Sequence, residues 1–375
     1  MFQQILQQIE KQLLEEKPFV VYRKPGQKLV KGIFQSDTKI HYCSDFKETG
    51  FVFAPFDEND EVILIPLEEV VEAPFELNVK GIHQDNIPPI HDSPSELDER
   101  NFHLQLVSKA IKEIEKGTFK KVVLSRQILS AYQGTPLQLF LKLLNTYLDA
   151  FCYMWYHPKV GLWLGATPEV LVSIQNKHIQ TMSLAGTQPY TGDPNPEWKK
   201  KDIEEQSMVT NYITEVLKNM VTQLQISETE SSRAGSLMHL RTKITGRLKV
   251  FDVKKLLKVL HPTPAVGGMP KNEAYLFIKA NENYKREFYT GYLGELNFKE
   301  EIVRASNNRN IENQAYRAIH TKTDLFVNLR SMQLVDKTAI IYIGGGITID
   351  SIPEQEWEET VNKSATMLKV IQNRL

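Results

Sequence analysis

The sequence predicts an α+β fold, in which antiparallel sheets are combined with separately placed helices. Short runs rich in β-branched and aromatic residues follow one another with only a few polar, glycine or proline residues between them. Long amphipathic segments with helical periodicity occur at intervals and do not follow every strand. Neighbouring strand pairs of this kind favour antiparallel pairing, because a parallel, doubly wound sheet requires regular alternation of strand and helix.

The composition is that of an ordinary globular protein with a small-molecule partner. The 375 residues include 45 basic and 46 acidic side chains, so no global field favours nucleic acid or an anionic membrane, and neither is expected as a partner. Cys43 and Cys152 are too few for a disulfide framework, and no Cys/His cluster has zinc spacing. No apolar run reaches the length of a transmembrane helix and the N-terminus lacks a signal-peptide pattern, so we expect a cytoplasmic protein.

The first hundred residues predict one helix and a series of short strands. Apolar residues at helical spacing mark residues 1–17 as a packed helix. The runs "FVVYRK", "KGIFQS", "KIHYCS", "GFVFAPF" and "EVILIPL", between Phe19 and Val71, predict an antiparallel meander. The proline-rich segment "HQDNIPPIHDSPSE" is typical of a loop. We therefore divide the chain into residues 1–98, a β-rich part of the same compact unit, and residues 99–375, which carry the motifs of interest.

Helices and strands are mixed in the second part. A helix that Ser95 could cap carries an apolar stripe and ends at Lys116 and Gly117, and the strand "FKKVVLSR" follows at once. The segment "PLQLFLKLLNTYL" predicts a helix, while "AFCYMWYHP", "VGLWLGATPEVLVSIQ" and "KHIQTMSLAG" predict strands. The polar stretch 299–322 breaks the strand pattern and is interpreted as an exposed excursion.

A pair of acids extends the apolar face of the helix predicted over residues 195–220. The stripe on this face consists of Val209, Ile213, Val216 and Met220. At about 100° per residue, Asp202 and Glu205 continue the stripe towards the N-terminus, whereas Glu204 points away. Two carboxylates therefore lie where an apolar face should continue.

The last helix repeats this arrangement. Over residues 352–375, Glu356 and Glu359 flank the apolar stripe and Glu358 lies opposite. Interaction with the helix dipole is one explanation for acids in a first turn, but it does not require them to face inward. Two converging, buried pairs would need a cation, and oxygen-only ligands point to Mg²⁺, which commonly shares its ligands with its substrate. A carboxylate substrate is the natural partner.

Glycines, a histidine and an arginine add candidate binding groups. Glycines end strands in "SLAGTQP", "REFYTGYLG" and "IYIGGGIT", where the backbone can approach a ligand, although turn formation is the commoner explanation for any one of them. None has the spacing of a phosphate loop. His261 could bind an anion or the loop backbone. Arg330 alternates with apolar neighbours, so its guanidinium requires an anionic partner, either a substrate carboxylate or a structural acid.

The ordered motifs of the second part resemble those of a known family. They are "KVVLSR", "GATPE", "LAGT", "KDIEEQ", "HPTPAVGG", "REFYTGYLGEL", "LR" and "GGGI" followed by "EWEET". From about Phe119 to the C-terminus they resemble the chorismate-utilising enzymes, especially isochorismate synthases, while the first hundred residues match only loosely. The resemblance implies a chorismate-binding fold of two packed antiparallel sheets with helices outside, chorismate as the substrate, and a Mg²⁺-dependent active site.

The resemblance also implies roles for individual residues. Lys121 would be the base that activates a water for attack on C2 of chorismate, and Glu169 would protonate the departing C4 hydroxyl. Without the resemblance, Lys121 would be interpreted as a solvated strand-end lysine beside Lys120. The implied metal ligands are Glu205 and Glu359, with Asp202 and Glu356 nearby. The implied substrate-binding residues are Gly186, Thr187, His261, Tyr289, Arg330, Gly344 and Gly345.

Related activities differ at a few of these positions. Anthranilate synthases carry glutamine where Lys121 stands and use a glutaminase partner, so a monomer without such a subunit is expected. Aminodeoxychorismate synthases tend to have a lysine where Ala185 stands. Salicylate synthases, which continue to pyruvate elimination, remain the alternative to an isochorismate synthase of menaquinone or siderophore biosynthesis, and a non-catalytic binder also stays open. The chain departs from the family pattern at Gln206, where histidine is frequent, and in the polar stretch 299–322.

Overall fold

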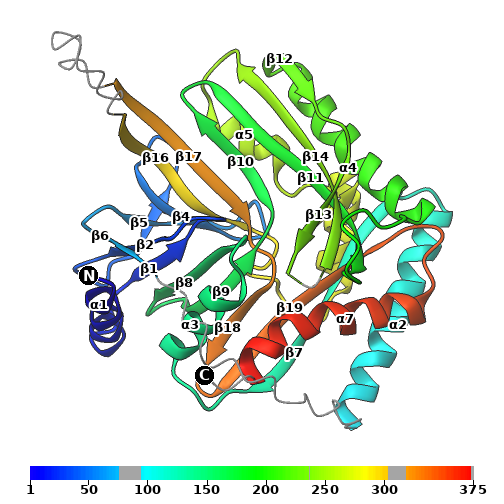
Figure 1. Cartoon of the computed structure of the whole chain (residues 1–375). Coiled ribbons are helices and arrows are strands. Elements are labelled where there is room, and N and C mark those ends of the chain that lie inside the picture. The colour runs from blue at the N-terminus through cyan, green and yellow to red at the C-terminus, as the bar shows by residue number, and fades with distance from the viewer. Residues whose placement is uncertain (76–93, 236, 303–317, 373–375) are drawn as a thin grey trace.

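Two large antiparallel sheets pack face to face in this protein, and helices cover their outer surfaces (Figure 1). The computed structural model describes residues 1–75, 94–235, 237–302 and 318–372. The predicted α+β fold, with two packed antiparallel sheets and helices outside, is confirmed. None of the helices in these ranges is both long enough and apolar enough to cross a membrane.

The first sheet, called sheet A, contains the strand that begins with Lys121. Within the described residues its strands run in the order β15, β7, β19, β18, β9, β8, β1, β2 and β6. Their bounds, in that order, are Gly268–Met269, Lys121–Ala131, Thr338–Ile347, Ser331–Val335, Gly161–Thr167, Phe151–His157, Phe19–Arg23, Leu29–Phe34 and Glu69–Pro74. The long pair of β7 and β19 therefore lies near one edge of the sheet, with only the short β15 beyond it.

The second sheet, called sheet B, brings the central strands of the chain together with part of its N-terminal region. Its described strands run in the order β12, β14, β11, β10, β17, β16, β4, β5 and β3, and β13 pairs with β14 beside this path. Their bounds, in that order, are Val221–Ile226, Leu237–Leu248, His178–Pro189, Val170–Gln175, Ala318–Val327, Tyr292–Ile302, Gly50–Ala54, Val62–Pro66 and His41–Cys43, and β13 is Glu230–Ala234.

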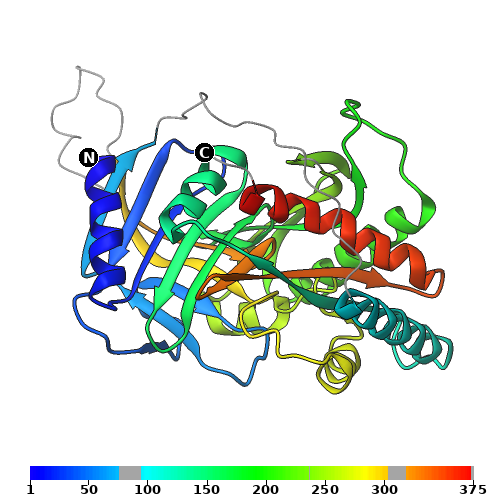
Figure 2. The ribbon, with the colours of Figure 1, turned by 90° about the horizontal axis from the view of Figure 1, so that it is seen from below.

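The helices lie on the outer surfaces of the two sheets. On sheet A, α1 (Phe2–Leu14), α3 (Pro136–Thr146) and α7 (Pro353–Gln372) share one apolar core with the strands, and Figure 2 shows them on the near side of this sheet. Towards the β7 edge, α2 (Pro94–Glu115) and α6 (Lys271–Asn281) form a second core. On sheet B, α4 (Lys200–Lys218) and α5 (Val253–Leu260) cover the outer face.

An aromatic core fills the space between the two sheets. Phe151 of sheet A stacks on Phe326 of sheet B with ring centroids 4.3 Å apart. Phe53 of β4 lies 4.7 Å from Trp155 of β8, measured between the same points. Aromatic side chains of this size bury large areas and hold their partners at defined angles, so this core fixes the two sheets relative to each other.

The predicted meander over the first strands is wrong. The strands themselves are present, but β1 and β2 belong to sheet A, whereas β3, β4 and β5 belong to sheet B. Alternation of apolar and polar residues identifies a strand but not its partner. Tyr22 of β1 and Phe51 of β4 face each other across the core with ring centroids 5.1 Å apart, so these two strands meet through their side chains and not through backbone pairing.

Most predicted helix positions are confirmed, with small shifts at the ends. α2 begins at Pro94, so Ser95 lies within the helix and does not cap it. The polar stretch 299–322 is a strand at both ends, because β16 continues to Ile302 and β17 begins at Ala318, which corrects the predicted excursion there. Its middle, 303–317, and most of the proline-rich segment lie outside the described residues.

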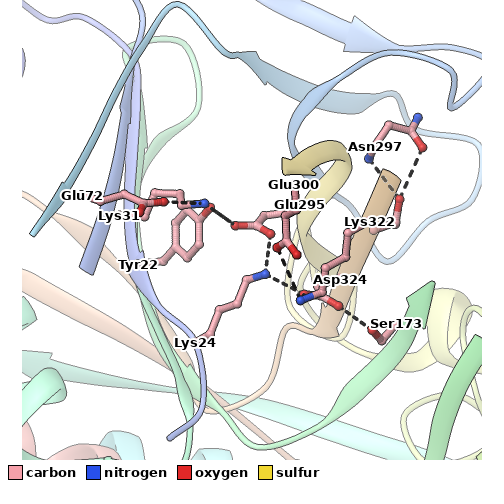
Figure 3. A network of polar contacts seen from close by, with 11 residues as sticks. Tyr22, Lys24, Lys31, Glu72, Ser173, Glu295, Asn297, Glu300, Lys322 and Asp324 are labelled. Atoms are coloured by element: carbon pink, nitrogen blue, oxygen red, sulfur yellow. Dashed lines mark hydrogen bonds and ion pairs between the residues drawn. The ribbon is translucent and has the colours of Figure 1, made fainter. Parts of the chain in front are cut away.

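A polar network joins the two sheets on the side away from β7 (Figure 3). Lys24, just after β1, makes ion pairs with Glu295 of β16 and, at 2.6 Å, with Asp324 of β17. The hydroxyl of Tyr22 donates a hydrogen bond to Glu295, and Lys31 of β2 lies 3.2 Å from the same carboxylate. Glu295 is almost completely buried, so these partners balance its charge inside the protein.

Candidate active site

The amine of Lys121 is completely buried at the start of β7. On one side of the strand, Lys121 pairs with Met269 of β15 through the backbone, and on the other side β19 pairs with the next residue, Val122. The Nζ atom lies 2.8 Å from Oε1 of Glu205 on α4, although it makes no hydrogen bond of ordinary geometry within the described residues. The lysine strand therefore does carry a cationic side chain into the interior.

Gly346 of β19 makes room for this pair. A Cβ atom at this position would lie 2.5 Å from Oε1 of Glu205, which is closer than Cβ atoms approach other atoms, and 3.1 Å from Cε of Lys121, which is a tight contact. At Gly345 the nearest atoms would be Oε2 of Glu356 at 3.8 Å and Oε1 of Glu359 at 3.9 Å, which are ordinary distances. The glycine run thus lies against the acids of both helices, and Gly346 has less free space around it than Gly345.

Glu169 lies in the short connection between β9 and β10 and is buried. Its backbone is held on both sides, because its amide donates to the Thr167 hydroxyl and its carbonyl accepts from the amide of Val327. Burial raises the pKa of the Glu169 carboxyl to about 8, and the charge of Lys121 opposes this rise. A carboxyl group in this state holds its proton at neutral pH and can donate it to a substrate.

The acids of α4 and α7 that helical periodicity predicted to face inward lie close together in the structure. Glu204 and Glu358 are exposed, whereas Glu205 and Glu359 are half-buried and line a common cavity. Burial raises the pKa of Asp202, and repulsion from Glu205 of the same helix and from Glu359 of α7 adds to this rise. The two helices are therefore close enough for their carboxylates to repel one another, which is a requirement for a shared cation.

Two lysines balance part of this negative charge. Lys201 makes an ion pair with Glu356, and Lys363 lies 2.7 Å from Oε1 of Glu359. Burial raises the pKa of Glu356, although Lys201 opposes it. Burial would also raise the pKa of Glu359, but the charge and hydrogen bond of Lys363 outweigh it and lower the pKa overall.

The donor set fits a hard divalent cation, although the described side chains would have to rearrange around it. Among the residues that the structure describes, no three His, Cys, Asp or Glu side chains are close enough together to form a metal site. However, Oε2 of Glu356 is buried without a hydrogen bond there, and Glu205 and Glu359 supply carboxylate oxygens to the same cavity. Oxygen ligands of this kind suit Mg²⁺, once Lys201 and Lys363 give up their present contacts.

Arg330 presents a guanidinium group to the cavity without a carboxylate partner among the described residues. It donates to the carbonyl of Ala234 at 3.1 Å and contacts Nε2 of His239 at 2.9 Å. Nδ1 of His239 lies 3.0 Å from the carbonyl oxygen of Gly186, which can only accept, so Nδ1 carries the proton and Nε2 accepts from Arg330. Burial lowers the pKa of His239 to about 3, which keeps the ring neutral beside the guanidinium.

Gly186 and Thr187 lie at the bend of β11 opposite α4. Gly186 has a positive φ of 73°, and a Cβ atom there would lie 3.1 Å from the Cβ atom of Asp202. Both the conformation and the close approach therefore favour glycine. The hydroxyl of Thr187 lies 3.2 Å from Nδ1 of His239, so the same short segment contacts the acid helix and the group that holds Arg330.

Tyr289 and Gly344 form another wall of the cavity. The ring of Tyr289 stacks on Tyr342 of β19 with centroids 5.4 Å apart, and a Cβ atom at Gly344 would lie 3.0 Å from the Tyr289 hydroxyl. Burial raises the pKa of this hydroxyl, so it stays protonated and can donate a hydrogen bond. Tyr289 and Arg330 both face the cavity, which places two donors at the same space.

A single cavity connects most of the predicted site residues. It encloses about 910 Å³, including the part open to solvent. Its lining includes Glu169, Gly186, Thr187, Glu205, Tyr289, Arg330, Gly344 and Glu359. Lys121 lies directly behind this lining, next to Glu205 and Gly346.

The other predicted residues lie outside the lining. Asp202, Glu356 and Gly345 are one layer behind it, next to residues that do line the cavity. His261 is buried, and its ring packs edge to face on Tyr292 with centroids 5.0 Å apart. Burial lowers the pKa of His261 to about 3.

Sequence reasoning missed His239, Gly346 and the two lysines beside the acids. His239 lies in a strand, and nothing in its local pattern distinguishes it from a core histidine. Gly346 belongs to the glycine run of the sequence, but only the structure shows which of the three glycines lies against Lys121 and Glu205. Lys363 follows Glu359 by four residues, a spacing that predicts an ion pair on a helix and could have been noticed.

The site combines the kinds of group that acid–base chemistry on a small anion requires. A buried amine and a protonated carboxylic acid lie at one cavity, and an arginine without an acidic partner faces the same space. A family model described as a chorismate binding enzyme matches residues 67–303, and a second model with the same description matches residues 315–369. The chain belongs to the chorismate-binding enzyme family.

Individual relatives carry different activities in their names. The chain is 28% identical over 282 residues to anthranilate synthase component 1 of Aquifex aeolicus, a match that covers 71% of this chain and 52% of that protein. It is 29% identical over 278 residues to isochorismate synthase MenF of Escherichia coli, a match that covers 72% of this chain and 59% of that protein. The matched part is thus about half to three fifths of the length of these relatives.

Solved structures agree with the fold over nearly the whole chain. One is a protein of Bacillus anthracis described as the 2,3-dihydroxybenzoate-specific isochorismate synthase DhbC, with a TM-score of 0.74 at 24% identity. The superposition covers 96% of this chain and 98% of that protein. The residues before Phe119, which matched the family motifs only loosely, therefore belong to the shared fold as well.

Proposed function

We propose that this protein isomerises chorismate to isochorismate, with Lys121 as the base and Glu169 as the acid. The observation that carries the proposal is that a buried amine and a protonated carboxylic acid lie at one cavity. Lys121 is buried beside Glu205, and Glu169 holds its proton up to a pH of about 8. Isomerisation by addition and loss of water requires one group that removes a proton and another that supplies one.

The proton transfers balance without any further reagent. Lys121 takes a proton from a water whose oxygen forms a bond to C2 of the substrate. The ring double bonds shift, the bond between C4 and its hydroxyl breaks, and Glu169 protonates the departing oxygen, which leaves as water. One water is consumed and one is released, and the two side chains return to their starting states by proton exchange with solvent.

The substrate has two carboxylates, and the cavity offers a separate place for each. Arg330 and Tyr289 would bind the pyruvyl carboxylate, because the guanidinium has no acidic partner among the described residues and the phenol is a protonated donor. His239 would keep the guanidinium oriented from behind. Fixing the ring in this way orients C2 and C4 towards the two catalytic groups.

Mg²⁺ would belong where Glu205 and Glu359 reach the cavity, with Asp202 and Glu356 next to them. When bound, the ion would neutralise the ring carboxylate of the substrate and the charge of the acids around it. Gly186, Thr187 and Gly344, which line the cavity, would leave space for the ring. The product would then serve menaquinone or siderophore biosynthesis.

Incubation of the purified protein with chorismate, with Mg²⁺ and with EDTA, tests this function by product analysis. We expect isochorismate to form only when Mg²⁺ is present. Salicylate together with pyruvate would indicate the salicylate synthase alternative, and an amine product that forms only with ammonia would indicate an anthranilate synthase activity. Binding of chorismate without any turnover would indicate a non-catalytic binder and would contradict the proposal.

A further inference from the structure

A second cavity lies directly outside the candidate active site, on the other side of Arg330. Its lining comes from the connection between α3 and β8, including Leu148 and Asp149, and from the β13–β14 hairpin, including Arg233 and Gly235. Pro168 and Arg330 line both cavities. We call the two spaces the inner cavity and the outer cavity, and Arg330 forms part of the boundary between them.

The side chains that line the two cavities differ in their exposure to solvent. Each residue that lines the inner cavity is buried or half-buried, whereas Leu148, Asp149 and Arg233 of the outer cavity are exposed. A small molecule that reaches Arg330 from solvent through the outer cavity therefore passes exposed side chains first and buried ones afterwards. This order is what an access route to a buried site requires.

Two guanidinium groups follow one another along this route. Arg233 lies 4.0 Å above the ring of Tyr190, measured to the ring centroid, and its Nε donates to the carbonyl of Gly235 at 2.9 Å. These contacts hold the side chain at the rim of the outer cavity. Neither Arg233 nor Arg330 makes an ion pair with a described residue, so both cations are free to meet an anion from solvent.

One acid in the outer lining opposes these two cations. Asp149 is exposed, and within the described residues it makes no ion pair with either arginine. The outer cavity therefore has two positive groups and one negative group in its lining. Local charges of this kind change the rate at which a charged ligand arrives, and the effect weakens as salt shortens the range of the field.

We propose that the outer cavity is the access route for the dianionic substrate, with Arg233 as its first carboxylate contact and Arg330 as the next. The proposal rests on the function proposed above, since it assumes a ligand with two carboxylates. A carboxylate held briefly by Arg233 then moves to the unpaired guanidinium at the inner boundary. Arg233 touches no reacting atom in this scheme, so it influences arrival and not the chemical step.

Association of chorismate with the wild-type protein and three variants tests the route. Stopped-flow tryptophan fluorescence would follow binding, because Trp163 stacks on Tyr342, a residue of the inner lining, with centroids 5.2 Å apart. Arg233→Gln should slow association about three- to tenfold at low salt, with unchanged kcat, and the difference should shrink as NaCl is raised. Asp149→Asn should speed association under the same conditions.

Arg247→Gln is the matched control. Arg247 is an exposed arginine near the other end of β14, so this substitution removes the same charge at a position outside both cavities. Equal association rates for Arg233→Gln and Arg247→Gln would overturn the proposal, and so would slower association in Asp149→Asn. Thermal melting of each variant checks that the fold is intact. A protein that binds chorismate without converting it would refute the proposed activity. The access route would still be tested in that case, because the association rates of the variants measure binding and not turnover.

Discussion

Nζ of Lys121 lies 2.8 Å from Oε1 of Glu205, inside a strand that otherwise buries apolar side chains. The pair links β7 of sheet A to α4 on sheet B, so the candidate base and a candidate metal ligand depend on each other. A charge in such a place is costly unless a partner is present, which explains why the two occur together. A cation held by Glu205 would also weaken the electrostatic attraction between this carboxylate and the amine of Lys121.

Lys121→Gln should abolish isomerisation while chorismate binding is retained. Glutamine has a similar length but cannot accept a proton from water, so kcat should fall by about 10²–10⁴-fold, the usual contribution of a positioned base. Lys120→Gln is the control, because Lys120 is exposed and points away from the site. Steady-state kinetics and equilibrium binding would measure both, and a Lys121 variant with normal turnover would remove this residue from the mechanism.

Gly346→Ala should also impair catalysis, although it adds only a methyl group. The new Cβ would lie 2.5 Å from Oε1 of Glu205, so the flexible end of that side chain must move away from Lys121 while the backbone stays in place. We expect kcat/KM to fall at least about tenfold with little change in the melting temperature.

Gly345→Ala provides the comparison for this effect. Its Cβ would meet the nearest carboxylate oxygens at 3.8 and 3.9 Å, which requires no displacement. Activity should therefore fall much less than in Gly346→Ala. Equal losses in the two variants would show that crowding of the Lys121–Glu205 pair is not the cause.

The sequence predicted the elements of this site better than their arrangement. The position of Glu205 and Glu359 on the inner faces of their helices followed from helical periodicity, since each helix fixes the direction of its own side chains. That α4 and α7 meet at one cavity could not be derived in this way, because α4 covers sheet B and α7 covers sheet A. Only the motif resemblance implied the convergence.

Prediction from the sequence was weakest where the partner of a side chain lies far away in the chain. Arg330 was expected to have either a substrate carboxylate or a structural acid as its partner, and the local sequence pattern could not decide between them; in the structure it lies in the turn between β17 and β18. In the structure its neighbours are a carbonyl group and His239, 91 positions earlier in the chain. A neutral histidine as the neighbour of an arginine has no local sequence signal, which is why His239 was missed.

Glu359→Gln should weaken the response of the enzyme to Mg²⁺. The substitution removes a negative charge from the ligand set and leaves Lys363 without its ion-pair partner, so the Mg²⁺ concentration needed for half-maximal activity should rise at least about tenfold. Isothermal titration with MgCl₂ would measure binding independently of turnover. Glu358→Gln removes the same charge from the exposed face of α7 and should titrate like the wild type.

The pH dependence of activity should follow Glu169. Because its carboxyl has a pKa of about 8 and must be protonated to act as the acid, kcat/KM should fall above pH 8 with a slope approaching one decade per pH unit. A profile measured from pH 6.5 to about pH 9.5 with saturating Mg²⁺ tests this. Constant activity across the whole range would argue against Glu169 as the proton donor.

The same group should make the protein less stable as the pH rises. The native state keeps a proton on Glu169 between pH 4.5 and about 8, whereas the unfolded chain has lost it, so the free energy of unfolding falls through this window by up to roughly 1.4 kcal/mol per pH unit. Glu169→Gln has no such proton to hold. Urea unfolding at pH 5 and pH 8 should therefore show a smaller decrease for the variant than for the wild type.

The network of Figure 3 should be important for stability and remote from catalysis. Lys24→Met removes one partner from Glu295, which is 1% exposed, and from Asp324. Leaving a buried carboxylate short of a partner typically costs about 3–5 kcal/mol, and the remaining contacts of Tyr22 and Lys31 should keep the loss towards the lower end of this range. Lys299→Met, at an exposed position of β16, is the control.

The acid side of this network has a defined pH window. Burial would raise the pKa of Asp324, but the charge of Lys24 and hydrogen bonds from Lys24 and Ser173 lower it overall. A lowered pKa contributes stability above the unfolded value of 3.8, and this contribution is lost as the pH falls through the folded value. The difference in unfolding free energy between the wild type and Lys24→Met should thus be constant near neutral pH and shrink below about pH 4. A difference that persisted unchanged at pH 3 would mean that Lys24 stabilises the protein through packing of its aliphatic chain and not through its ion pairs.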